Sequence, residues 1–278
     1  MDYALTMQDV PFRTLDNVVD GLAELEVEYR RTNDRRAVFL TLYGIVSAEI
    51  RTRVARREFL DNEWVHRYAV AFADLYRVAL AGYDAGDRTR IPKAWVMAFD
   101  AARAGTGLVV QDMFLGVNAH VNADLPHALT TISIEPDRPA RYRDHAAVNA
   151  VLGAVIDRAT ARISELYAPG LPHIDQSAGT LDEMLSMFSL EVGRESAWEA
   201  ATSLANARNT FERGLVTRLI STRASALARL LLSPSRNEPL MAACRRLEQG
   251  TDWLTLLADR SHMPRLPDVI PTRSGHLS

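Results

Sequence analysis

The stretch from Gln111 to Leu129 constrains the fold more than any other part of the chain. Its sequence, QDMFLGVNAHVNADLPHAL, would surround a helix with apolar side chains, which is typical of a helix inside a protein. The same stretch carries five polar side chains: Gln111, Asn118, His120, Asn122 and Asp124. Burying a polar group without a hydrogen-bond partner costs about 1–3 kcal/mol. These groups therefore need partners from each other, from another helix, or from a metal or ligand.

The spacing of the polar groups places them on two neighbouring faces. His120 and Asp124 are four residues apart, so their side chains share one face of the helix. Asn118 and Asn122 share the next face, and Gln111 lies about two turns earlier on the side of Asn118. This arrangement predicts one wall of a polar pocket inside a helical bundle.

Pro126 marks the expected end of this central helix. Proline has no backbone N–H, and its ring disfavours a helical conformation in the residue before it. We therefore expect the helix to stop at Pro126, with His127 just beyond it and able to fold back toward Asp124. Residues 130–134, TTISI, alternate like a short strand, but the sequence offers no second strand to pair with it.

Composition limits the class of protein. The chain has 278 residues, 47% of them hydrophobic and 24% charged, as in ordinary soluble globular proteins. Its net charge of −3 predicts no nucleic-acid partner, because nucleic-acid binding relies on basic side chains. The single cysteine, Cys244, excludes a four-cysteine zinc site, so a metal would need histidine and carboxylate ligands. With no apolar leader and no run of about 18 apolar residues, we expect a cytoplasmic protein without a membrane span.

Apolar residues recur at helical spacing along nearly the whole chain. The pattern predicts about nine helices, over residues 14–31, 36–57, 62–83, 95–103, 111–125, 142–167, 181–205, 206–232 and 238–247. No repeat of fixed period and no clear linker divides them. We expect an all-α fold, a single helical-bundle domain at residues 1–260 with a buried polar central helix. A flexible C-terminal tail, rich in proline, would follow at 261–278.

His120 and Asp124 are the principal candidates for chemistry. Such a pair can act as metal ligands, or as a general base with the carboxylate that orients it. A structural alternative is a hydrogen bond that only satisfies two buried polar groups. For a divalent cation such as Zn²⁺, further ligands would come from His127, His66 or Asp144.

The expected substrate-binding residues are polar or aromatic side chains that could surround this pair. They are Asn118, Asn122, Gln111, Trp95, Tyr68 and Arg194. Arg194 is three residues from Glu191, so it would form either a buried ion pair or a clamp for an anion. The sequence contains no phosphate-binding loop, dinucleotide-binding glycine motif or nucleophile elbow.

Several motifs resemble one uncharacterised, mostly actinobacterial family of helical proteins that carries a domain-of-unknown-function label. They are WxxAFDAAR at 95–103, LGVNAHVNADL at 115–125, DHAAVN at 144–149 and FSLEVGRESAW at 188–198. The resemblance covers roughly residues 15–230. It implies an all-α fold and brings no activity with it.

A second, weaker resemblance is to the zinc-dependent phospholipase C and P1-nuclease group of helical enzymes. Those enzymes carry an H-x-x-x-D helix followed by another histidine, as His120, Asp124 and His127 do here. Their second pair, H-x-x-x-E, is missing, because His145 is followed at that spacing by Asn149. The resemblance implies a site for one or two zinc ions rather than three.

Three functions follow from these observations. The first is a divalent-metal-dependent hydrolase of an ester or phosphoester, centred on His120 and Asp124. The second is a metal-free cyclase, isomerase or lyase that uses His120 as acid or base on an apolar small molecule, as in secondary-metabolite (polyketide-like) biosynthesis. The third is a non-catalytic module that binds a small apolar molecule or a protein. The sequence leaves the substrate and the oligomeric state open.

Overall fold

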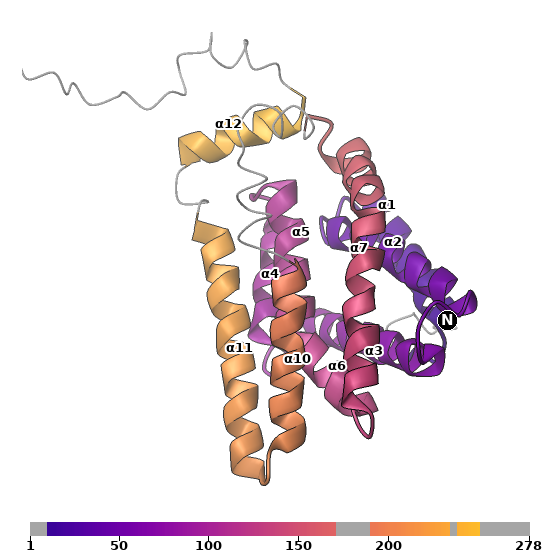
Figure 1. Cartoon of the computed structure of the whole chain (residues 1–278). Helices are drawn as coiled ribbons and strands as arrows, with labels where there is room; N and C mark the ends of the chain where they lie inside the picture. The colour runs from indigo at the N-terminus through magenta and orange to yellow at the C-terminus, as the bar shows by residue number, and fades with distance from the viewer. Residues whose placement is uncertain (1–9, 171–189, 234–237, 251–278) are drawn as a thin grey trace, which may run out of the picture.

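The computed structural model describes residues 10–170, 190–233 and 238–250 (Figure 1). The elements of this part are all helical. They are α1 (Leu15–Arg31), α2 (Ala37–Ala55), α3 (Asn62–Asp84), α4 (Lys93–Ala104), α5 (Val109–Asn118), η1 (Ala119–Asp124), α6 (Leu125–Ile132), α7 (Arg138–Tyr167), α10 (Leu190–Asn206), α11 (Thr210–Leu232) and α12 (Glu238–Glu248). Because α5, η1 and α6 follow one another without a break, the described helices form nine rods. The prediction of an all-α single domain is confirmed.

Other sequence predictions fall wholly or partly outside the described residues. The tail at 261–278 does so entirely, and the helix predicted at 181–205 is described only from Leu190. The proposed domain limits at 1 and 260 stay a prediction. Within the described residues, no helix has the length and apolar character that a membrane span requires.

Side-chain caps explain where four helices begin. Thr14, Asp61, Asp137 and Asn209 each accept a hydrogen bond from the backbone N–H three residues later. Such caps satisfy N–H groups that have no partner within the helix. Helix α4 ends at Gly105, whose φ of 64° lies in the left-handed region that glycine adopts readily.

The predicted end of the central helix at Pro126 is wrong. Pro126 is the second residue of α6, and the chain remains helical from Val109 to Ile132. The six residues before α6 form the π-helix η1, after which the N–H of Leu125 donates to the carbonyl of His120, five residues earlier. This wider turn lets the α-helix restart at Leu125, and proline is tolerated in a first turn because the N–H it lacks has no partner there. Residues 130–132 belong to α6, and Ser133 ends it.

The central rod is enclosed by helices from both halves of the chain. It contacts α2, α3 and α4 from the N-terminal half, and α10 and α11 from the C-terminal half. In Figure 1, α10 and α11 run side by side as a long hairpin along one flank, while α12 lies across one end of the molecule. Asn118, His120 and Asp124 are at most 3% exposed, so the prediction of a buried polar central helix is confirmed.

Candidate functional site

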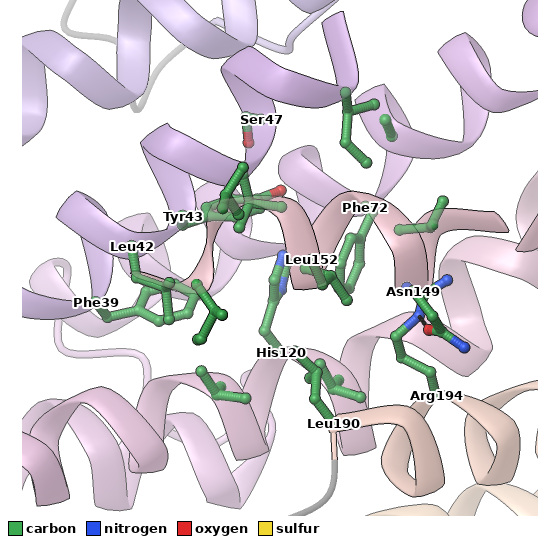
Figure 2. Close-up of a pocket in the computed structure, with 18 of the residues that line it drawn as sticks. Phe39, Leu42, Tyr43, Ser47, Phe72, His120, Asn149, Leu152, Leu190 and Arg194 are labelled. Carbon is green, nitrogen blue, oxygen red and sulfur yellow. Dashed lines mark hydrogen bonds between the residues drawn. The ribbon is translucent and has the colours of Figure 1, made fainter. Parts of the chain in front are cut away.

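A cavity of about 400 Å³ lies between α1, α2, α3, α7, α10 and the central rod. This volume is within the range of small-molecule sites in proteins. Most of its wall is apolar, with Phe39, Leu42, Phe72, Leu152 and Leu190 among the lining residues shown in Figure 2. Polar side chains also reach the wall: Tyr43, Ser47, Tyr68, His120, Asn149, Glu191 and Arg194. The cavity therefore suits an apolar molecule that carries few polar groups.

His120 is held in place by a short relay of buried hydrogen bonds. Its Nδ1 lies 3.0 Å from Oδ2 of Asp124, and the same oxygen accepts a 2.7 Å hydrogen bond from Nε1 of Trp95. All three side chains are buried. Because a carboxylate accepts hydrogen bonds, Nδ1 of His120 carries the proton. The i,i+4 spacing correctly predicted that His120 and Asp124 share a face.

Aromatic rings fix the orientation of the His120 imidazole. The ring of Phe72 stacks on it, with centroids 3.5 Å apart and planes inclined by 7°. Tyr43 meets it edge-on, with centroids 4.5 Å apart. Burial raises the pKa of Tyr43 well above its usual value, so its hydroxyl stays protonated near neutral pH. The imidazole is therefore held between a flat apolar surface and a neutral phenol.

The second ring nitrogen of His120, Nε2, differs from Nδ1 in its hydrogen bonding. Nε2 is buried and has no hydrogen-bond partner in the described structure. Burial lowers the pKa of His120, and this effect outweighs the opposing influence of Asp124. The imidazole is therefore neutral near pH 7, with the proton on Nδ1 and a bare lone pair on Nε2. A neutral imidazole nitrogen without a hydrogen-bond partner can accept a proton, as a general base does.

Arg194 forms a second polar group on the cavity wall. Its Nε donates to Oδ1 of Asn149 at 2.8 Å, and its Nη1 donates to the hydroxyl of Tyr68 at 3.3 Å. Its Nη2 donates to the carbonyl of His145 at 2.5 Å. Of the two alternatives for Arg194, the ion pair with Glu191 does not form, since Arg194 pairs with no carboxylate in the described residues.

The three amide side chains predicted to bind substrate are placed elsewhere. Gln111 donates from Nε2 to the carbonyl of Leu231, and Asn118 donates from Nδ2 to the carbonyl of Ala224, both at 2.9 Å. Asn122 donates to Oδ1 of Asn118 at 3.1 Å. None of the three lines the cavity. Gln111 and Asn118 fasten the central rod to α11, because main-chain carbonyls of α11 accept their protons, and Asn122 in turn donates to Asn118.

The side chains predicted to hold a metal are not gathered into one site. Among the residues that the structure describes, no group of three or more His, Cys, Asp or Glu side chains is placed to hold an ion. Asp144 accepts backbone hydrogen bonds from Leu60 and Asp61 at 2.7 and 2.8 Å, ahead of α3. His66 and His127 are half-buried and absent from the cavity wall. The donor set therefore does not fit the zinc site that the second resemblance implied.

Trp95 and Tyr68, both predicted to bind substrate, do not lie on the same cavity wall. Tyr68 lines the cavity, whereas Trp95 lies behind His120 and holds Asp124. Sequence reasoning did not select Tyr43, Phe72 or Asn149 for the site. Tyr43 and Phe72 follow the ordinary apolar pattern of α2 and α3, so nothing in the sequence distinguishes them from core residues.

These observations define the class: an all-α single-domain protein with a largely apolar cavity, a carboxylate-oriented histidine and an arginine on the cavity wall. A family model of unknown function, DUF5995, matches residues 15–234, and the chain belongs to that family. No curated protein and no solved structure matches the chain.

Proposed function

We propose that this protein is a metal-free acid–base enzyme that moves a proton on an apolar small molecule, with His120 as the base. The observation that carries the proposal is the buried Nε2 of His120, which has no partner although Nδ1 is fixed by Asp124. Nε2 would accept a proton from a carbon next to a carbonyl and return it at the same or another position. Isomerisation, cyclisation and elimination all begin with such a step.

The relay behind His120 supports this role. As Nε2 takes up a proton, the imidazole becomes positively charged, and the carboxylate of Asp124 stabilises that charge at 3.0 Å. The hydrogen bond from Trp95 keeps the carboxylate aimed at Nδ1. The π-helix η1 carries both members of the pair, and segments of this kind occur frequently at functional sites.

A first experiment tests whether Nε2 is reactive and can be reached from the cavity. The protein is treated with a medium-chain bromomethyl ketone, which loses bromide as its methylene carbon bonds to an imidazole nitrogen. We expect modification at His120, located by peptide mass spectrometry, and none there in His120→Gln. His66 serves as the internal control, because it is half-buried outside the cavity. Labelling of His66 without labelling of His120 would contradict the proposal.

A second experiment tests the chemistry itself. Medium-chain ketones and oxo acids are incubated with the protein in D₂O, and exchange of the protons beside the carbonyl is followed by NMR. We expect wild-type protein to accelerate the exchange and His120→Gln to remove the acceleration, typically about 10²–10⁴-fold for a general base. The matched variant His66→Gln should keep the wild-type rate. Equal rates for wild type and His120→Gln would refute the proposal.

A further inference from the structure

The guanidinium of Arg194 is a buried cation at the wall of an apolar cavity. The residue is only 4% exposed, and its acceptors are the neutral oxygens of Asn149, Tyr68 and His145. No described carboxylate pairs with it. Buried charges in proteins are normally paired, because an unpaired charge loses its hydration without compensation. The lack of a counter-ion among the described residues is the observation that needs an explanation.

Arg194 still has hydrogen-bonding capacity toward the cavity. A guanidinium carries five N–H donors. The contacts to Asn149 and Tyr68 use one donor each, and those to the carbonyl and Nδ1 of His145 use both donors of Nη2. One N–H of Nη1 therefore has no acceptor among the described residues. Arg194 and Tyr68 both line the cavity, so a ligand bound there can contact both side chains.

The buried charge at this end of the cavity is +1, that of Arg194. His145 adds no charge, because Nε2 donates to the carbonyl of Arg194 at 3.1 Å while Nδ1 carries no proton and accepts from Nη2 of Arg194. Burial, reinforced by the charge of Arg194, lowers the pKa of His145 to about 2. Glu191 also lines the cavity, but it is exposed and forms no ion pair with Arg194. A ligand with one negative charge balances this site, whereas a phosphate monoester carries about 1.5–2 charges at pH 7.

We propose that Arg194, with Tyr68 and Asn149, binds the carboxylate of an apolar carboxylic acid whose hydrocarbon chain fills the cavity. The inference assigns a substrate class to the proposed acid–base enzyme and rests on the same cavity. In Figure 2, Arg194 and Asn149 lie together at one side, and Phe72, Leu152 and His120 follow along the pocket. An acid held at Arg194 therefore extends its chain along apolar side chains toward Nε2 of His120.

The test compares ligands that differ only in the head group. Decanoic, dodecanoic and tetradecanoic acids are titrated by calorimetry into the protein, alongside the matching primary alcohols and alkyl phosphates. We expect the best-fitting acid to bind at least about tenfold more tightly than its alcohol, as charge-assisted hydrogen bonds do in buried sites. It should also bind more tightly than the alkyl phosphate. Equal affinities, or no binding of any acid, would overturn the inference.

Variants of the arginine make the test specific. Arg194→Met should abolish the preference for the acid and keep the affinity for the alcohol within about threefold. Arg194→Lys should keep part of the preference, because it retains the charge and loses the planar fork. Arg218→Met, which removes an exposed arginine of α11, is the matched control and should behave as wild type. A preference that survives in folded Arg194→Met would refute the assignment.

Two further measurements distinguish a failure of the carboxylate site from misfolding of a variant and from a failure of the catalytic proposal. If Arg194→Met does not fold, Tyr68→Phe tests the same site, and we expect a partial loss of the acid preference. His120→Gln should retain the full preference, because His120 lies away from the carboxylate. Loss of preference in Arg194→Met combined with unchanged proton exchange in His120→Gln would leave the head-group site standing and remove the catalytic proposal.

Discussion

Removing the carboxylate of Asp124 should strongly destabilise the protein, in an amount that the structure allows us to estimate. In Asp124→Ala, Nε1 of Trp95 and Nδ1 of His120 lose their common acceptor and stay buried. Each buried donor left without a partner costs about 1–3 kcal/mol, so the free energy of unfolding should fall by about 2–6 kcal/mol. Asp124→Asn retains an acceptor oxygen, and we expect a smaller loss.

The mechanism of this loss can be isolated by a double-mutant cycle with Trp95→Phe. Once the carboxylate is gone, deleting the indole N–H removes one unsatisfied donor, so Trp95→Phe should cost less in Asp124→Ala than in the wild type. We expect a coupling of about 1–3 kcal/mol, since the packing lost with the indole is common to both backgrounds. Urea unfolding at pH 7, followed by circular dichroism, gives the four free energies.

A control cycle shows whether the coupling is local. Asp144 accepts its hydrogen bonds from Leu60 and Asp61, and shares no partner with Trp95. The effects of Asp144→Ala and Trp95→Phe should therefore add. A coupling below about 0.5 kcal/mol between Trp95 and Asp124 would refute the relay as a stabilising unit, because independent sites add to within that value.

Two other predictions concern packing and pH. Gly116→Ala would place its methyl 2.5 Å from the ring of Phe39, which lines the cavity, so we expect a loss of about 1–3 kcal/mol and weaker ligand binding. A methyl group added at Gly44 of α2 would meet no atom within 4 Å, so Gly44→Ala should instead raise the free energy of unfolding by up to about 1 kcal/mol. Thermal unfolding of both variants tests this, and an unchanged stability of Gly116→Ala would contradict the reasoning. His145 has a folded pKa near 2, below its ordinary 6.5, so the unfolded chain binds more protons as pH falls. The unfolding free energy should therefore drop by up to about 1.4 kcal/mol per pH unit below pH 6.5 on account of His145, and an equally steep drop in His145→Gln would disprove this assignment.

Much of the fold could be predicted because helical periodicity is a local property of the chain. The spacing of apolar residues is readable within a few residues, and the helices that it predicts agree with the structure. The proximity of His120 to Asp124 follows in the same way from one turn of helix. The break expected at Pro126 failed because the local rule for proline assumes a regular α-helix on both sides, and η1 supplies a π-helical turn instead.

Which residues line the cavity could not be predicted, because this depends on contacts between segments far apart in the sequence. Asn118 and Gln111 were sensible candidates for ligand binding, yet their partners are carbonyls of α11 that lie 106 and 120 residues further along the chain. Arg194 was left between an ion pair and an anion clamp, and the absence of a described carboxylate beside it favours the clamp. Tyr43 and Phe72 carry no signal of their own, since an aromatic ring on a buried helix face is most often core.

The amino-acid sequence is enough to predict that this chain is a helical bundle, and that one of its helices must bury polar groups and find partners for them. Those conclusions need only the period of a helix and the cost of an unsatisfied polar atom. Which of these polar groups have hydrogen-bond partners within the protein depends on tertiary contacts, which the sequence does not reveal. Gln111 and Asn118 of the central rod donate to carbonyls of α11, while Nε2 of His120 and one N–H of Arg194 lack partners among the described residues. Long-range packing alone places His120 and Arg194 on one cavity, where we expect the ligand to bind.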